Sequence, residues 1–231
     1  MAYGPFFAVK NIEVTGNRSI SSSEIIKSVS YLYGKSLLMV RQKEVVHRIM
    51  DSVPVQEVKV GYKLPHTLII KVKEREIAAA LPYLSGFALI DSHGIVVKLE
   101  SSLENYSIPV VTGLNVTSAR VADRPVVDKN PDAFRMLLSL VSSLSTFSAE
   151  LSEIHVESDA GSNNGWTFYL YTLDGYQIYL GDFEEKKIPM IKDILDDIRK
   201  NGRGKGILDM SHETPVFKPL EKATTKDGVG G

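Results

Sequence analysis

Five histidines and one glycine-rich segment are the residues of this chain whose types could support metal or phosphate binding. The histidines are scattered, without the spacing of metal ligands: His47, His66, His93, His155 and His212. The segment Gly202-Arg-Gly-Lys-Gly206 has the composition of a phosphate-binding loop. Such loops follow a strand and open a helix, whereas this one follows a predicted helix and enters a predicted strand. We therefore predict a helix end and a turn at 202–206, and neither a metal nor a cofactor.

Two clusters of polar side chains are also better explained by structure than by chemistry. Three aspartates between positions 193 and 197 lie opposite the apolar stripe of a predicted helix and beside basic residues, which is typical of a solvated face. Four tyrosines between positions 169 and 179 could stack on bases or sugars, but no basic stripe accompanies them, and aromatic pairs stabilise sheets. The motifs of serine hydrolases, zinc proteases and nucleotide-binding loops are absent. These patterns therefore give no candidate catalytic residue.

The composition limits the classes of partner. The chain has 231 residues, of which 27 are Lys or Arg and 28 are Asp or Glu, a formal net charge of -1. No overall basic excess would attract it to nucleic acid or to an anionic membrane surface. It has no cysteine, which excludes disulfides and cysteine nucleophiles. Its apolar runs are far shorter than the roughly 20 residues that cross a bilayer. Because the chain lacks a signal peptide and begins at once with strand-like sequence, we expect it to be trimmed from a longer protein.

The first 77 residues predict the element order β-α-α-β-β. Ile12 and Val14 alternate with polar neighbours, as in a half-buried strand, and Ser21 with Glu24 fits a capping box before a short helix. A second helix ends before Pro54, and the alternating runs around 58–62 and 68–72 predict a hairpin. This pattern predicts two helices on one face of a three-stranded sheet.

Residues 78–220 predict a second domain with a mixed, mainly antiparallel β-sheet and flanking helices. A hairpin is predicted around Asp91-Ser-His-Gly94, and three more strands lie between 154 and 180 with a turn at Asp174-Gly175. Apolar residues at helical spacing indicate helices at 134–144 and 188–198. Residues 112–131 are too polar and interrupted for a regular element. The fold class is therefore α+β.

The last predicted strand is Thr214-Pro-Val-Phe-Lys218, and residues 221–231 after it are predicted to be a disordered tail. Because nothing in that tail could cover the strand, its outer N–H and C=O groups would remain unpaired. An extended partner segment could satisfy them by adding a strand, although Pro215 removes one donor. The alternative is that this strand is merely the last element of the sheet, protected by its shortness and by Pro215.

Several segments occur in an order that is typical of one protein family. Two frame the first domain: Phe7-Ala-Val-Lys-Asn-Ile-Glu-Val-Thr-Gly-Asn17 and Leu64-Pro-His-Thr-Leu-Ile-Ile-Lys-Val-Lys-Glu-Arg75. Others follow: Leu89-Ile-Asp-Ser-His-Gly94, Ile108-Pro-Val-Val-Thr-Gly113, Ile178-Tyr-Leu-Gly181 and Ile207-Leu-Asp-Met210. Together they resemble the bacterial cell-division family FtsQ/DivIB, whose extracytoplasmic part joins a POTRA domain to a β domain. The resemblance implies a POTRA domain at 1–77 and the β domain at 78–220.

The resemblance also implies a function without catalysis. Members of the family scaffold the division machinery at the periplasmic face of the cytoplasmic membrane, anchored by an N-terminal transmembrane helix that is missing here. They bind FtsB/DivIC-type and FtsL-type division proteins, and we expect other divisome proteins to bind the POTRA domain. The alternatives are a POTRA module of a protein translocation or two-partner secretion system and a periplasmic hydrolase with an unusual site.

Strand addition at the C-terminal strand matches the way in which the family holds FtsB. On this interpretation Ser211, His212 and Thr214 line the entry to the site, and Phe217 is its apolar anchor. Ser211 stands where the family often has a basic residue. The predicted partner-binding residues are Ser211, His212, Thr214, Val216, Phe217 and Lys218.

Overall fold

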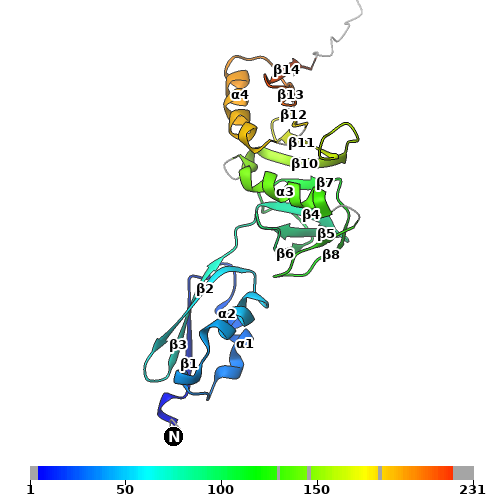
Figure 1. Ribbon diagram of the computed structural model, residues 1–231. Coiled ribbons are helices and arrows are strands. Elements are labelled where there is room, and N and C mark those ends of the chain that lie inside the picture. Colours follow the sequence, from blue (N-terminus) through cyan, green and yellow to red (C-terminus); the bar gives the residue numbers. More distant parts are fainter. Residues whose placement is uncertain (1–4, 129–130, 145–146, 182–183, 221–231) are drawn as a thin grey trace, which may run out of the picture. The chain divides into compact units, whose positions relative to one another are not determined.

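The computed structural model describes residues 5–128, 131–144, 147–181 and 184–220, so the predicted disordered tail at 221–231 lies outside the described residues. Contacts divide the chain into two compact units. The first unit comprises residues 1–105 and 115–129, and the second comprises residues 106–114 and 130–231. Figure 1 shows the elements of both units along the chain.

The first unit begins with the predicted β-α-α-β-β arrangement. Its strands β1 (Asn11–Thr15), β2 (Val55–Lys63) and β3 (Thr67–Glu74) form a sheet in the order β1-β3-β2. β1 is parallel to β3, and β2 and β3 form the predicted antiparallel hairpin. Helices α1 (Ser22–Ser28) and α2 (Gln42–Met50) cover one face of the sheet (Figure 1).

Alternating side chains from the three strands meet the apolar stripes of the two helices in one core. Ile12, Leu68 and Ile70 from the sheet and Ile25 and Ile49 from the helices are buried there. The Ser21 side chain accepts a hydrogen bond from the Glu24 N–H and caps α1, as predicted. The first helix is shorter than its apolar spacing predicts, because the chain tightens after Ser28 into the 3-10 segment η2 (Ser30–Leu32). Two further 3-10 segments, η1 (Pro5–Phe7) and η3 (Leu37–Met39), flank the core.

Glu74, at the end of β3, holds the loop that follows β1. Its carboxylate accepts hydrogen bonds from the backbone N–H groups of Arg18 (2.5 Å), Ser19 (3.0 Å) and Ile20 (2.9 Å). Burial by itself would raise the pKa of Glu74, but these hydrogen bonds outweigh it and lower the pKa from the ordinary value of 4.5. The ionised carboxylate is therefore the form that closes this loop.

Glu74→Gln should lower the free energy of unfolding by about 1–2 kcal/mol at neutral pH, because a neutral amide oxygen accepts these hydrogen bonds less strongly. A carboxyl whose pKa is lowered by folding stabilises the protein above its unfolded pKa, and this contribution is lost as the pH falls through the folded value. When the pH is lowered below about 4.5, the free energy of unfolding should therefore fall less in the variant than in the parent protein. Urea unfolding at pH 7 and pH 3.5 measures both effects. Equal losses for Glu74→Gln and for the exposed control Glu76→Gln would contradict this role.

The rest of the first unit contains three antiparallel strands and a small hairpin. β5 (Gly86–Ile90) and β6 (Val96–Glu100) form the hairpin predicted around residues 91–94. β4 (Ala79–Tyr83), which pairs with β5, was not predicted as a strand. Its residues 79–81 are fully buried and show no alternation of polar and apolar positions.

The prediction of no regular element at 112–131 is wrong, because β8 (Val116–Ser118) and β9 (Val126–Val127) form a two-stranded sheet there.

A buried ion pair joins the end of the first predicted domain to the β5–β6 turn. The Arg75 guanidinium contacts the Asp91 carboxylate at 2.5 Å, and their side chains are 14% and 5% exposed. The other Asp91 oxygen accepts hydrogen bonds from the backbone N–H groups of His93 (2.9 Å) and Ile95 (2.8 Å). Asp91 therefore shapes the turn and at the same time pairs with Arg75.

The second unit contains six strands and two long helices. In chain order they are β7 (Val110–Thr112), α3 (Pro131–Ser143), β10 (Leu151–Ser158), β11 (Trp166–Thr172), β12 (Gln177–Tyr179), α4 (Ile188–Lys200), β13 (Gly206–Asp209) and β14 (Val216–Pro219). The 3-10 segments η4 (Ser148–Glu150) and η5 (Glu185–Lys187) precede β10 and α4. Both helices bury their apolar stripes, and the predicted cross-strand tyrosine contact is present between Tyr169 and Tyr179, with ring centroids 5.1 Å apart.

The strands of the second unit are hydrogen-bonded in the order β14-β13-β12-β11-β10-β7, and β4, β5 and β6 of the first unit are hydrogen-bonded in the order β4-β5-β6. β10 is parallel to β7 and β12 is parallel to β13, whereas the β10–β11–β12 pairs, β13–β14 and β4–β5–β6 are antiparallel. The architecture is the predicted α+β class, with a β-α-α-β-β unit followed by a mainly antiparallel sheet and helices.

The glycine-rich segment 202–206 is the predicted turn. The N–H groups of Gly202 and Arg203 donate to the carbonyls of Arg199 and Ile198, and Gly202 has φ +60°. This is the glycine-ended helix terminus that satisfies the last carbonyls of a helix. The chain then enters β13, so the backbone N–H groups of Gly202 and Arg203 end α4 and are not free to hold a phosphate.

Candidate functional site

Strand β14 is the last strand of the sheet of the second unit, as predicted for the C-terminal strand. It pairs antiparallel with β13, with Leu208 opposite Phe217 and Gly206 opposite Pro219. The strand begins two residues later than predicted and includes Pro219, so Thr214 and Pro215 precede it. Its outer edge is the candidate partner-binding site.

The register of β14 decides which of its backbone groups face outward. The Leu220 N–H donates to the Lys205 carbonyl at 2.9 Å, which makes these two residues a directly hydrogen-bonded pair. Such pairs alternate along an antiparallel ladder, so Val216 and Lys218 direct their backbone groups toward β13, and Phe217 and Pro219 direct theirs outward. Within β14, the backbone groups of Phe217 and Pro219 are therefore the ones directed to the open edge, and those of Val216 and Lys218 are directed to β13.

The outer edge of β14 is poor in donors. Pro219 has no N–H, so within the strand the Phe217 N–H is the single outward donor, whereas the carbonyls of Phe217 and Pro219 both face outward. A sheet edge with proline at an outward position resists indiscriminate pairing. A partner strand would have to supply more donors than acceptors at this edge.

The Phe217 side chain packs inside the second unit. Its ring centroid lies 6.3 Å from that of Tyr176, over which the Arg199 guanidinium of α4 is placed. A Cβ added to Gly206 would lie 2.7 Å from two carbons of the Phe217 ring, so the ring occupies the space above this glycine. Opposite Phe217, Leu208 is fully buried. Phe217 is therefore a packing residue whose backbone, rather than its ring, faces the open edge of the sheet.

The opposite face of β14 is exposed and carries a charged cluster. Val216 is 40% exposed, and the Lys218 Nζ lies 3.5 Å from the Asp209 carboxylate of β13. Asp209 also accepts hydrogen bonds from the Ser211 hydroxyl (2.6 Å) and the Ser211 N–H (3.1 Å). Burial alone would raise the pKa of Asp209, but the hydrogen bonds from Ser211 and the nearby Lys218 lower it. Asp209 is thus the ionised anchor of the turn that leads into β14.

Lys187 of η5 holds the same turn from the other side. Its Nζ donates to the carbonyls of Met210 (3.1 Å) and His212 (3.3 Å) and pairs with Glu184 at 2.9 Å, and its side chain is only 14% exposed. Sequence reasoning missed Lys187 because it stands among ordinary surface charges. A lysine near the start of a helix carries no pattern that connects it with a turn more than twenty residues later.

The predicted site residues thus fall into two groups. Ser211, His212 and Thr214 lie together in the exposed turn before β14, and the side chains of Val216 and Lys218 lie on the exposed face of the strand. Phe217 is half-buried on the opposite face. The described residues include no group of three or more His, Asp or Glu side chains arranged to hold a metal ion. The arrangement provides a strand edge beside a hydrogen-bonded, charged turn, which suits binding of an extended peptide.

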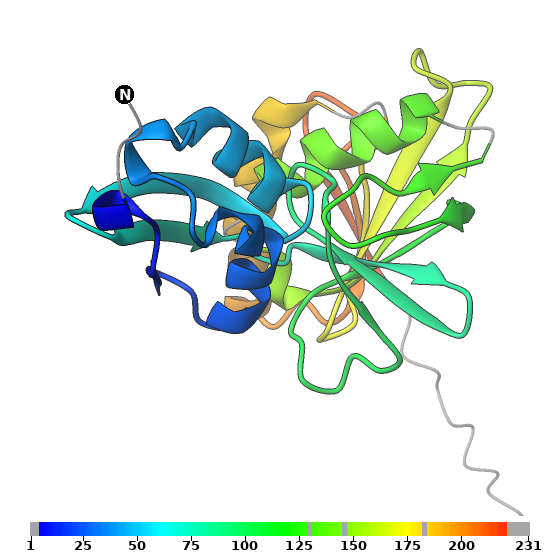
Figure 2. The same ribbon diagram turned by 90° about the horizontal axis from the view of Figure 1, so that it is seen from below.

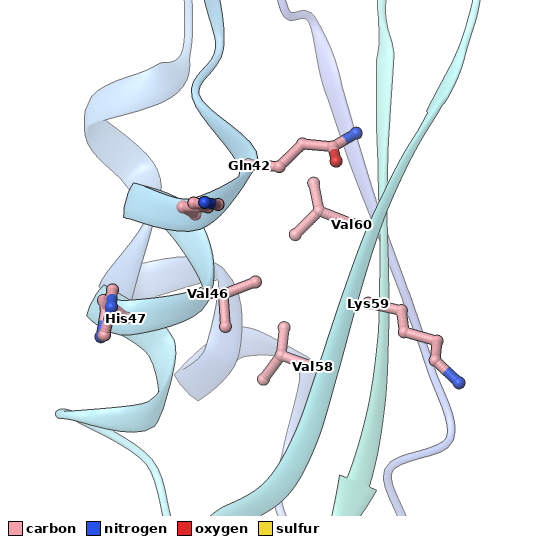
Figure 3. A pocket seen from close by; sticks show the side chains of 7 residues that line it. Gln42, Val46, His47, Val58, Lys59 and Val60 are labelled. Carbon is pink, nitrogen blue, oxygen red and sulfur yellow. The ribbon is translucent and has the colours of Figure 1, made fainter.

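A second candidate surface is the groove between α2 and the edge strand β2 (Figure 3). It has a volume of about 510 Å³, and Val46 of α2 faces Val58 and Val60 of β2 across it. Gln42 and Lys43 of α2 lie along the same groove. Like β14, β2 is the last strand of its sheet in the described residues, so its outer backbone groups are open to an added strand.

Two family models match consecutive parts of the chain. Residues 7–75 match the POTRA domain of the FtsQ type. Residues 80–211 match the C-terminal region of the cell division protein FtsQ/DivIB. The second match covers more than half of the chain and ends at Ser211, before β14.

Individual relatives agree with these matches. Cell division protein FtsQ of Geobacter sp. (strain M21) is 31% identical over 182 residues, which cover 76% of this chain and 62% of that protein. Cell division protein DivIB of Clostridium botulinum (strain Hall) is 26% identical over 216 residues, covering 92% of this chain and 82% of the relative. DivIB of Clostridium tetani is 28% identical over 52% of this chain and 45% of that protein. DivIB of Clostridium acetobutylicum is 24% identical over 51% of this chain and 47% of that protein. The chain therefore matches about half of the length of these two relatives.

Among solved structures, the chain is similar to the major extracytoplasmic domain of the cell division protein DivIB from Geobacillus stearothermophilus. The sequence identity is 16% and the TM-score is 0.33, with 54% of this chain and 97% of that chain covered. This similarity is too low to support a functional inference. In the described part of this chain, no helix has the length and hydropathy needed to cross a membrane.

Proposed function

Since this chain belongs to the FtsQ/DivIB family of cell division proteins, we propose that it is a non-enzymatic scaffold of the division machinery that holds its partners by strand addition at β14. The proposed partners are the FtsB/DivIC-type and FtsL-type division proteins. The proposal places the chain at the extracytoplasmic face of the cytoplasmic membrane, anchored in the full-length protein by a helix outside this sequence. The proposed domains are the POTRA domain at 1–77 and the β domain at 78–220.

The observation that carries this proposal is the edge position of β14. The outward Phe217 N–H and the outward carbonyls of Phe217 and Pro219 can pair with an extended segment, and the ring of Phe217 fixes the strand on the sheet. The turn at 210–214 is held by Lys187 and Asp209, so the entry to the edge is preorganised. A preorganised edge loses less conformational entropy on binding than a mobile one.

The groove beside β2 supports the second part of the proposal, that other divisome proteins bind the POTRA domain. Apolar side chains line its floor, and the open strand edge lies beside them. The alternative function, a POTRA module of a translocation or two-partner secretion system, is less consistent with the chain, because the matching POTRA model is of the FtsQ type and the FtsQ/DivIB C-terminal region follows it.

Backbone amide exchange should reveal the partner strand directly. In the free protein the Phe217 N–H should exchange rapidly, whereas the N–H groups of Val216 and Lys218, which face β13, should be protected. On addition of an FtsB-type peptide, the Phe217 amide should become protected by tenfold or more. NMR-detected hydrogen exchange measures all three amides in one sample, so Val216 and Lys218 serve as internal controls.

A peptide that binds with saturation and leaves the Phe217 amide unprotected would place the site elsewhere. Val216→Lys tests the exposed face of the strand, since Val216 is 40% exposed and stands opposite Asp209, where a cation is tolerated. This variant should weaken peptide binding with little change in the melting temperature. Phe217→Ala, in contrast, should lower stability as well as binding, because its ring packs on Tyr176 and Gly206.

A further inference from the structure

Large apolar side chains are exposed together at one end of the three-stranded sheet. They come from three segments, 5–10, 33–43 and 62–66, and are between 40% and 73% exposed. The side chains are Phe6, Tyr33, Leu38, Met39, Tyr62 and Leu64. Such a concentration of exposed apolar surface in a soluble unit indicates an interaction site.

Backbone contacts hold the three segments next to one another. Ala8 forms a bridge with Ser36, and the Val9 N–H donates to the Lys35 carbonyl at 2.9 Å. On the other side, the Lys10 N–H donates to the His66 carbonyl at 2.9 Å. Figures 1 and 2 show the N-terminal segment and the β2–β3 turn at the same end of the sheet. We call the three segments together the basic apolar tip.

The charge of the basic apolar tip differs from that of the whole chain. The tip carries five exposed cations and neither Asp nor Glu, although the chain as a whole has a formal net charge of -1. The cations are Lys10, Lys35, Arg41, Lys43 and Lys63. The carboxylates beside the tip are Glu13, which lies 3.4 Å from the Lys63 Nζ, and the exposed Glu44 of α2. The tip therefore keeps a positive excess.

A partner that fits this surface must be apolar and anionic at once. The exposed side chains project from a hairpin turn, a 3-10 segment and the start of the described chain, rather than from the walls of one groove. Projecting Leu, Met, Phe and Tyr side chains suit the headgroup region of a bilayer, where Lys and Arg reach the lipid phosphates. We propose that the basic apolar tip binds the surface of a membrane containing anionic phospholipids. This proposal goes beyond partner binding at β14, which belongs to the second unit.

Site-specific fluorescence tests the contact. The chain has no cysteine, so Leu64→Cys and the control Leu173→Cys, which are 63% and 69% exposed in the parent protein, each provide one position for an environment-sensitive dye. With vesicles of phosphatidylcholine and phosphatidylglycerol, the dye at position 64 should shift to the blue and gain intensity. The dye at position 173 should not respond, and pure phosphatidylcholine should produce a weaker response at position 64. The response should also fall as salt is raised.

Two double variants distinguish the effect of the charge of the tip on vesicle binding from the effect of the net charge of the protein. Lys10→Glu/Arg41→Glu changes the tip, and Arg135→Glu/Lys186→Glu changes the net charge by the same amount at exposed positions of the second unit. The first variant should lower the partition coefficient onto anionic vesicles by about tenfold or more, and the second should change it far less. Melting curves would verify that both remain folded.

Two results would overturn the proposal. Equal losses in the two charge variants would show that the attraction depends only on overall charge. The absence of binding to vesicles of any composition would exclude lipid as the ligand of the tip. An acidic protein would then be the remaining candidate partner. Neither result bears on β14, because peptide binding there is measured without vesicles.

Discussion

Arg75→Gln is expected to lower the free energy of unfolding by about 3–5 kcal/mol, because it leaves the buried Asp91 carboxylate without its cationic partner. The Asp91 side chain is only 5% exposed, so water cannot replace the guanidinium. The backbone N–H groups of His93 and Ile95 would still donate to Asp91, but they carry no full charge. Urea unfolding monitored by circular dichroism measures the loss.

A surface ion pair provides the matched control. Arg120 and Asp123 pair at 2.7 Å, but their side chains are 82% and 53% exposed. Arg120→Gln should therefore change stability by less than about 1 kcal/mol. The double variant Arg75→Gln/Asp91→Asn should recover part of the loss of the single variant, because it removes the unpaired charge. A single variant as stable as the parent protein would show that Asp91 is solvated and that the pair is dispensable.

Ile12→Asp is expected to unfold the POTRA domain. Ile12 lies in β1 and packs into the core beneath α1, where an aspartate would be desolvated without a partner. The cost should exceed about 4 kcal/mol, which is comparable to the whole stability of a domain of this size. Thermal unfolding followed by amide exchange of β3 measures the effect.

Thr15→Asp is the control on the same strand. Thr15 is exposed on the opposite face and stands beside Lys71, so an aspartate there should be tolerated. If the POTRA and β domains fold independently, as proposed, Ile12→Asp should leave the slow-exchanging amides of β11 protected. Loss of protection in β11 would argue against a boundary near residue 77, and a folded Ile12→Asp variant would contradict the packing of β1.

Local patterns determined much of the fold. Alternation identified β1, β2, β3 and the β10–β12 strands, and helical spacing identified α2, α3 and α4. The cap at Ser21 and the turn at Gly202 depend on hydrogen bonds between residues at most five positions apart. Such features are encoded within a few neighbouring residues, so they can be read without knowledge of the tertiary structure.

Strands without a local pattern were missed. β4 is buried over residues 79–81, so it shows an uninterrupted apolar run instead of alternation. β8 and β9 are two or three residues long and rich in polar neighbours, which gives no period to detect. In both cases the partner strand is close in the sequence, β5 for β4 and β9 for β8, so what is missing is a detectable period in the strand itself.

The sequence by itself determined the family, the α+β class and the presence of a last strand that could be open at its edge. Only the tertiary structure decided which groups that strand presents, because register assigns the Phe217 backbone to the outside and β-sheet alternation puts its ring against Tyr176. The Lys187 contacts with the turn and the gathering of five cations in the basic apolar tip also appear only after folding. The contacts of Lys187 with Met210 and His212 and of Phe217 with Tyr176 join residues that are more than 20 positions apart, and no local propensity specifies such contacts.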